Sequence, residues 1–145
     1  VEAKQVFLNA DNIAEIIPTD VDYVVDAIDT VTSKLALVKY CYESNIKIMS
    51  SMGTGNKMDP SQFRVTDVFK TKVCPLAKVM RSELKKRGVK KLKVVYSEEM
   101  PMTPDKGDAV PSGKRQTPGS MPFVPPVAGM IIAGEVIKDL VGISK

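Results

Sequence analysis

The chain has 145 residues, of which 43% are hydrophobic and 26% are charged, and its formal net charge is +4. This composition is typical of one globular domain and not of a disordered protein. Because the chain has no histidine and only two cysteines, Ser-His or Cys-His catalysis, a His-ligated metal site and a disulfide framework are excluded within it.

The first third of the chain predicts alternating strands and helices. A short apolar run at residues 5–9 indicates a strand, and residues 13–17 indicate a short helix. Residues 23–28 are almost continuously apolar, which is typical of a parallel strand buried on both faces. A helix at residues 34–43 and a strand at residues 46–50 follow, so this region predicts a βαβ unit.

The remaining elements are two strands, two helices and one long connection. Residues 63–68 alternate between apolar and polar types and predict a half-exposed strand, which we expect to be antiparallel. A helix at residues 75–87 and a strand at residues 92–96 come next. Residues 98–119 contain four prolines and three glycines. This is long for a connection inside a compact domain, so we expect a mobile or functional loop. A helix at residues 126–141 closes the chain.

The carboxyl end of the strand at residues 23–28 is the place where we expect a ligand. In open α/β sheets, ligands bind outside the carboxyl ends of the strands. Asp29 lies there, just before a predicted helix, and a Mg²⁺ ion could bridge its carboxylate to a polyphosphate. An N-terminal cap of the helix is an equally good explanation for this residue.

Three longer strings are specific in combination. They are VDYVVDAIDTVTSKLALVKYC (residues 21–41), IKIMSSMGTGNKMDPSQFRVTDVFKTKVCPLAKVMRSELKKRGV (residues 46–89) and FVPPVAGMIIAGEVIKDL (residues 123–140). Together they resemble the tRNA threonylcarbamoyladenosine dehydratases, which belong to the ThiF/MoeB/HesA group of ubiquitin-activating-like adenylating enzymes. The resemblance runs from about residue 5 to residue 142 and is weak through the Pro-rich connection.

The resemblance implies a fold and an activity. The fold is a Rossmann-like α/β sheet of ThiF type with mixed parallel and antiparallel strands. Residues 1–145 would form the C-terminal portion of one adenylating domain. Family members bind ATP with Mg²⁺ and adenylate a carboxylate. In the dehydratase branch this is the threonyl carboxylate of the modified adenosine in tRNA, which then cyclises. A homodimer is also implied.

One part of the family pattern is absent from this sequence. The glycine-rich phosphate loop belongs ahead of Val1, and no G-x-G-x-x-G or Walker A motif occurs here. The chain also has no initiating Met and no signal peptide. We therefore expect it to begin within a longer protein, and to bind ATP poorly and be inactive alone.

The resemblance also implies roles for individual residues. Asp29, the second aspartate of D-A-I-D, matches the catalytic carboxylate that is associated with the metal and ATP. Asp26, inside the strand, is expected to be structural or to orient its neighbours. Lys34, Gly53 and Gly55 are expected to contribute to cofactor binding. Their alternatives are a solvated lysine and an ordinary turn.

A basic cluster follows the helix at residues 75–87. A solvated helix face usually explains such a run, but an RNA substrate makes phosphate contact a comparable explanation. Cys74 is expected to be structural or incidental, because the dehydratase chemistry needs no thiol. The alternative is a reactive thiol used with a sulfur-transfer partner. Cys41 is expected in the core. The cluster includes Arg81 and Lys93, and its members that are expected to contact RNA are Lys85, Lys86, Arg87, Lys90 and Lys91.

Two other functions are compatible with the pattern. The first is adenylation of the C-terminus of a sulfur-carrier protein, and the second is a non-catalytic partner-binding module with the same fold. The basic cluster and the lack of CxxC pairs argue against the first, and the missing pairs also argue against structural zinc.

The apolar segment at residues 121–142 is not expected to span a membrane. Glu135, Lys138 and Asp139 interrupt it, so its apolar stretch is shorter than the ~20 residues that a span needs. Their spacing indicates the polar face of an amphipathic helix. We expect a reduced, cytoplasmic setting.

Overall fold

A four-stranded mixed sheet with the order β1-β2-β4-β3 forms the centre of the molecule. In the computed structural model, which describes residues 1–103 and 118–143, β1 (Val24–Asp26), β2 (Ile48–Ser51) and β4 (Lys93–Ser97) are parallel. β3 (Phe63–Asp67) pairs with β4 in the antiparallel direction. The fold class predicted from the sequence, with its βαβ unit and its antiparallel strand, is confirmed.

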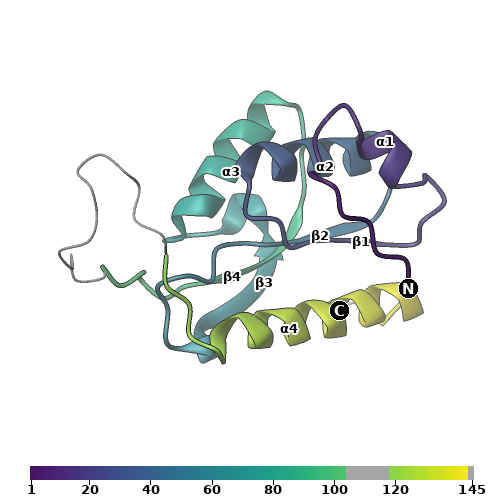
Figure 1. The fold of residues 1–145 in the computed structure, drawn as a ribbon. Helices are drawn as coiled ribbons and strands as arrows, with labels where there is room; N and C mark the ends of the chain where they lie inside the picture. Colours follow the sequence, from purple (N-terminus) through teal and green to yellow (C-terminus); the bar gives the residue numbers. More distant parts are fainter. Residues whose placement is uncertain (104–117, 144–145) are drawn as a thin grey trace.

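Helices cover both faces of this sheet. Figure 1 shows α1, α2 and α3 on one face and α4 on the other. α2 connects the parallel strands β1 and β2, and α3 precedes β4. The helices are α1 (Ile13–Ile16), α2 (Val31–Glu43), α3 (Pro75–Lys86) and α4 (Val124–Val141), with short 3-10 helices η1 (Pro60–Gln62) and η2 (Val68–Lys70) on either side of β3.

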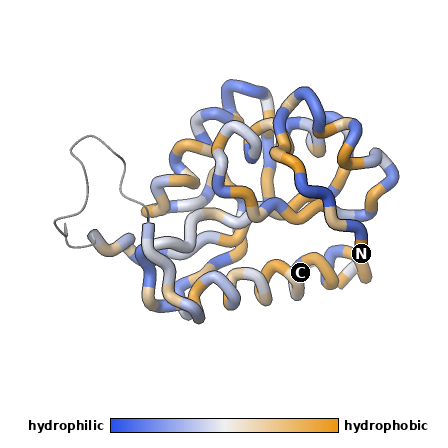
Figure 2. The backbone as a smooth tube through the Cα atoms, in the orientation of Figure 1, coloured by the Kyte–Doolittle hydropathy of each residue, from blue (hydrophilic) through white to orange (hydrophobic). Residues whose placement is uncertain are grey.

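The core follows from the alternation of side chains along the strands. Val94 faces α2 and α3, where it packs with Met80 and Leu84, whereas Val95 faces α4 and packs with Ala128. Figure 2 shows apolar residues concentrated in the strands and along α4. A third cluster lies under α1 and contains Cys41, which is fully buried as predicted.

The strand predicted at residues 5–9 is not formed, and this prediction was wrong. Val6 and Phe7 are exposed, and the segment pairs with no strand in the described part of the chain. An apolar run becomes a strand only where a neighbouring strand accepts its backbone hydrogen bonds.

Two helices, α2 and α4, begin earlier in the chain than predicted. α4 begins at Val124 because Pro125 and Pro126 fit a first helical turn, where the missing N–H groups need no partner.

Two expectations concern the carboxyl-terminal part of the chain. Of the predicted loop at residues 98–119, residues 104–117 lie outside the described residues. Within residues 1–103 and 118–143, no helix is long and apolar enough to cross a membrane.

The contact between α3 and the sheet predicts a large effect on stability. Leu84 is fully buried, so Leu84→Ala should lower the free energy of unfolding by roughly 2–5 kcal/mol. Val79→Ala, at an exposed position of the same helix, should change it by less than about 0.5 kcal/mol. Denaturant unfolding measures both variants, and equal losses would contradict the described orientation of α3.

Candidate functional site

The carboxyl edge of the sheet collects the loops that follow β1, β2 and β4. The N-terminus of α2 follows the β1 loop directly, and the N-terminal part of α3 lies beside the β2 loop, where Leu76 approaches Gly53. Both helices therefore present their positive ends at this edge, where anions are favoured. This arrangement makes the carboxyl edge the candidate site.

Asp29 lies in the turn between β1 and α2 and is exposed. The helix N-cap is Thr30, and Asp29 makes no hydrogen bond or ion pair with any described residue. The cap explanation for Asp29 is therefore wrong. Its carboxylate is available to a cation at the carboxyl edge.

Asp26 lies in β1 and is completely buried. Its Oδ1 atom accepts a hydrogen bond from the Ile28 backbone N–H at 3.0 Å. Its Oδ2 atom accepts one from the Ser50 hydroxyl on β2 and lies 2.9 Å from the Lys34 ammonium on α2. One carboxylate thus joins the β1–α2 turn, α2 and β2.

Lys34 has an exposed fraction of 0%, so the explanation that it is a solvated lysine is wrong. Its ammonium forms a close ion pair with Asp26, but no described residue accepts a hydrogen bond from it in regular geometry. Burial lowers the pKa of Lys34, and the carboxylates of Asp26 and Asp29 oppose that shift. Lys34 therefore contacts the turn that carries Asp29 through Asp26, whose other carboxylate oxygen binds the Ile28 N–H.

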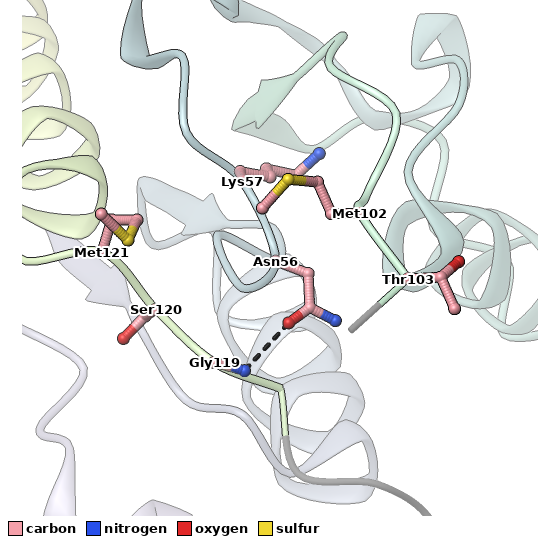
Figure 3. Close-up of a pocket in the computed structure, with 7 residues that line it drawn as sticks. All are labelled: Asn56, Lys57, Met102, Thr103, Gly119, Ser120 and Met121. Atoms are coloured by element: carbon pink, nitrogen blue, oxygen red, sulfur yellow. Dashed lines mark hydrogen bonds between the residues drawn. The ribbon is translucent and has the colours of Figure 1, made fainter. Parts of the chain in front are cut away.

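The loop after β2 is fastened to two other segments by Asn56. Its side-chain Oδ1 accepts a hydrogen bond from the Gly119 N–H at 2.9 Å, and its backbone N–H donates to the Gly119 carbonyl at 2.7 Å. Its carbonyl accepts from the Met102 N–H at 2.8 Å. Figure 3 shows the Asn56 side chain directed at Gly119, with Met102 and Met121 on either side. Asn56 has a φ of 57°, a conformation that asparagine adopts more readily than most residues.

Glu99 fastens the same loop from the end of β4. Its carboxylate accepts hydrogen bonds from the N–H groups of Met58 and Asp59 at 2.9 and 3.0 Å. Its carbonyl accepts one from the buried Lys57 ammonium. The two loops therefore form one hydrogen-bonded unit.

A cavity of about 420 Å³ lies beside this unit. Its lining combines two methionines with polar backbone and side-chain groups. The residues that line it are Asn56, Lys57, Met102, Thr103, Gly119, Ser120 and Met121.

The two glycines of this loop have different surroundings. A Cβ atom on Gly55 would lie 2.8 Å from the Cβ atom of Pro118, which is too close for any side chain. A Cβ atom on Gly53 would lie 3.9 Å from Leu76, which is an ordinary contact. Gly55 thus allows the segment at Pro118 to pack, and cofactor contact by either glycine stays a prediction.

The basic cluster lies at the other edge of the sheet, where α3 ends and β4 begins. The five residues of the cluster that are expected to contact RNA are all exposed. Lys86 and Arg87 both pair with Glu83, and these contacts lower the pKa of that carboxyl. Lys85, Lys90 and Lys91 remain the most available charges.

Cys74 is 2% exposed at the N-terminus of α3. Its burial agrees with the expected structural role and does not favour the alternative of a reactive thiol.

The carboxyl edge fits Mg²⁺ better than a metal with many protein ligands. The described residues include no group of three or more Cys, Asp or Glu side chains that could hold a metal. Mg²⁺ usually binds through one or two carboxylates plus phosphate oxygens and water. An unpaired exposed carboxylate beside a helix N-terminus suits that mode of binding.

Comparison with known proteins adds a family and several relatives. The model of the ThiF family matches residues 1–145. The tRNA threonylcarbamoyladenosine dehydratase of Bacillus subtilis is 37% identical over 147 residues, covering 95% of this chain and 58% of that protein. The dehydratase of Escherichia coli is 42% identical over 79 residues, covering 54% of this chain and 30% of that protein. The chain thus spans little more than half of the Bacillus relative.

Solved structures agree with the fold. The Escherichia coli tRNA N6-threonylcarbamoyladenosine dehydratase TcdA in complex with AMP superposes with a TM-score of 0.83 at 31% identity, over 96% of this chain and 56% of that one. The complex of TcdA with ATP gives a TM-score of 0.81 at 28% identity, over the same shares of the two chains.

The surroundings of the two glycines predict opposite results for the same substitution. Gly55→Ala should displace the segment at Pro118 and accelerate hydrogen exchange of the Asn56 amide, which donates to Gly119. Gly53→Ala should leave that exchange unchanged, because its new methyl group meets only an ordinary contact. Equal protection of the Asn56 amide in both variants would show that Gly55 is not needed for this packing.

Proposed function

The chain belongs to the ThiF family, and we propose that it supplies the carboxyl edge of the ATP site in an enzyme that adenylates the threonylcarbamoyladenosine carboxylate in tRNA. The observation that carries the proposal is the unpaired Asp29 carboxylate at the end of β1, beside the N-terminus of α2. The dehydratase relatives and the TcdA complexes with AMP and ATP support it.

Asp29 would hold Mg²⁺ against the phosphates of ATP. The chemistry that Mg²⁺ supplies when bound is neutralisation of the negative charge that grows on the α-phosphate during adenylation. The N-terminus of α2 would favour the same phosphates through its free N–H groups. Asp29 would thus be the point where this chain touches the cofactor.

The remaining parts of the proposed ATP site fall into two groups. Lys34 is buried against Asp26, so it would support Asp29, and any direct contact with phosphate would require it to leave that ion pair. Gly53 lies in the neighbouring loop with room for a close ligand. The glycine-rich phosphate loop is not in this sequence, so residues 1–145 alone would not turn over ATP.

The basic cluster would contact tRNA away from the reacting carboxylate. α3 separates the two edges, and its 12 residues correspond to roughly 18 Å. A tRNA is long enough to reach both edges, with phosphates at Lys85, Lys90 and Lys91. The cluster would then contribute to RNA affinity without touching ATP.

The first test of the proposal concerns Asp29. In the complete protein, Asp29→Asn should reduce the formation of AMP and pyrophosphate by at least about a hundredfold, because a charged partner of the metal is lost. Asp22→Asn, which changes an exposed aspartate before the same strand, should leave both products unchanged. Both are measured with ATP, Mg²⁺ and tRNA that carries threonylcarbamoyladenosine. Near-normal turnover of the Asp29 variant would refute the metal role.

The second test concerns RNA affinity. Reversing the charge of Lys85, Lys90 and Lys91 should weaken tRNA binding and flatten its dependence on salt by nearly one log–log unit for each lost phosphate contact. Reversal of the exposed Lys4, Lys39 and Lys70 gives the same change in net charge and serves as the control. Affinity is measured at several salt concentrations. Parallel slopes for the two variants would mean that the cluster is only a solvated face.

A further inference from the structure

We infer that the buried network of Asp26, Lys34 and Ser50 is a positioning device for Asp29, which holds the β1–α2 turn in the conformation that binds the metal. The inference rests on the proposed metal role of Asp29. All three members of the network have an exposed fraction of 0%, so none of them touches a ligand at the surface. Their effect on the site would pass through the turn.

Among the described residues, Asp26 is the one side chain that forms a hydrogen bond with the backbone of the turn. The Ile28 N–H, one residue before Asp29, donates to Asp26 Oδ1 at 3.0 Å. On the other side of Asp29, the N-cap Thr30 makes no side-chain hydrogen bond to the helix. Release of Asp26 would therefore leave the backbone on either side of Asp29 without a side-chain hydrogen bond, although Ile28 and Val31 still pack against the core.

Lys34 and Ser50 fix Asp26 from two different elements. The Ser50 hydroxyl reaches it from β2, and the Lys34 ammonium reaches it from α2, at 2.9 Å. The position of the turn is thus tied to the strand beside it and to the helix after it. In other proteins, hydrogen bonds and ion pairs to groups around a metal ligand orient that ligand without touching the metal.

Stability alone does not explain this network. Replacement of a buried ion pair by apolar groups of similar volume is often neutral or stabilising, so a pair of buried charges is a weak source of stability. Here the carboxylate also binds a backbone N–H of the turn, which an apolar pair could not do. The network specifies a conformation at the place where Asp29 is needed.

The test compares network variants of the complete protein with a matched control. Asp26→Asn combined with Lys34→Met removes both charges together, and Ser50→Ala removes one hydrogen bond while leaving the pair. Lys93→Met is the control, because Lys93 pairs with Glu135 and Asp139 in contacts that lie at the other edge of the sheet. The measurements are the Mg²⁺ concentration that half-saturates ATP binding, by calorimetry, and the hydrogen exchange of the Ile28 amide.

The double variant should raise the half-saturating Mg²⁺ concentration by about tenfold or more, because the loss of groups that orient a metal ligand weakens metal binding by that much in other proteins. It should also accelerate hydrogen exchange of the Ile28 amide. Ser50→Ala should give a smaller change in the same direction. Lys34→Arg, which keeps the charge, should retain most of the affinity for Mg²⁺, and Lys93→Met should leave both readouts unchanged. If the double variant does not fold, Ser50→Ala and Lys34→Arg carry the test.

Combination with Asp29→Asn shows whether the network acts through Asp29. In that background the network variants should have no further effect on the Mg²⁺ requirement, because coupled residues are not additive. An unchanged Mg²⁺ requirement in the network variants, or an equal further loss on top of Asp29→Asn, would overturn the inference. If Asp29→Asn itself leaves the requirement unchanged, the proposed metal role fails, and the inference fails with it.

Discussion

The rest of the candidate site depends on the buried carboxylate of Asp26. A charge in the interior costs several kcal/mol unless close partners compensate it. Asp26 has three such partners, which come from the turn after β1, from α2 and from β2. The loss of any one of them would loosen the junction between the first parallel strand pair and its connecting helix, which is where Asp29 lies.

Hydrogen bonds between the loop that follows β2 and the loop that follows β4 are the second feature that shapes this edge. Asn56 holds Met102 and Gly119, and Glu99 holds the backbone at Met58 and Asp59. These hydrogen bonds join the described parts of the two loops. Together with the Asp26 network, they give the carboxyl edge a defined shape before any ligand arrives. Such preorganisation is what a site for a charged transition state requires.

Much of the fold could be predicted because the strands differ in their patterns. The continuous apolar run before Asp29 indicated a parallel strand buried on both faces; the strand is parallel, but the expected burial was wrong, because Val25 is exposed. The alternation in β3 indicated a half-exposed antiparallel strand, as observed. The strand predicted at residues 5–9 was wrong, because an apolar pattern carries no information about whether a pairing strand is present.

The site was only partly predictable. Asp29 stood out because it directly follows the apolar run at residues 23–28, although β1 itself ends at Asp26. The burial of Lys34 could not be predicted, because its position in the sequence is compatible with either face of the helix. Only the structure shows that Asp26 lies beside it. Asn56 and Glu99 act through contacts with residues 40 to 63 positions away, which no local pattern reveals. The one signal that could have been used for Asn56 is its residue type, because asparagine tolerates the positive φ found there.

A structure of the complete protein with Mg²⁺ and a non-hydrolysable ATP analogue tests the central claim most directly. We expect a carboxylate oxygen of Asp29 at about 2.0–2.1 Å from the metal, or joined to it through one water molecule. Lys34 should remain paired with Asp26, and the Ile28 N–H should still donate to Asp26. A metal held without Asp29, or Lys34 turned from Asp26 to a phosphate, would contradict the claim that the buried network positions Asp29.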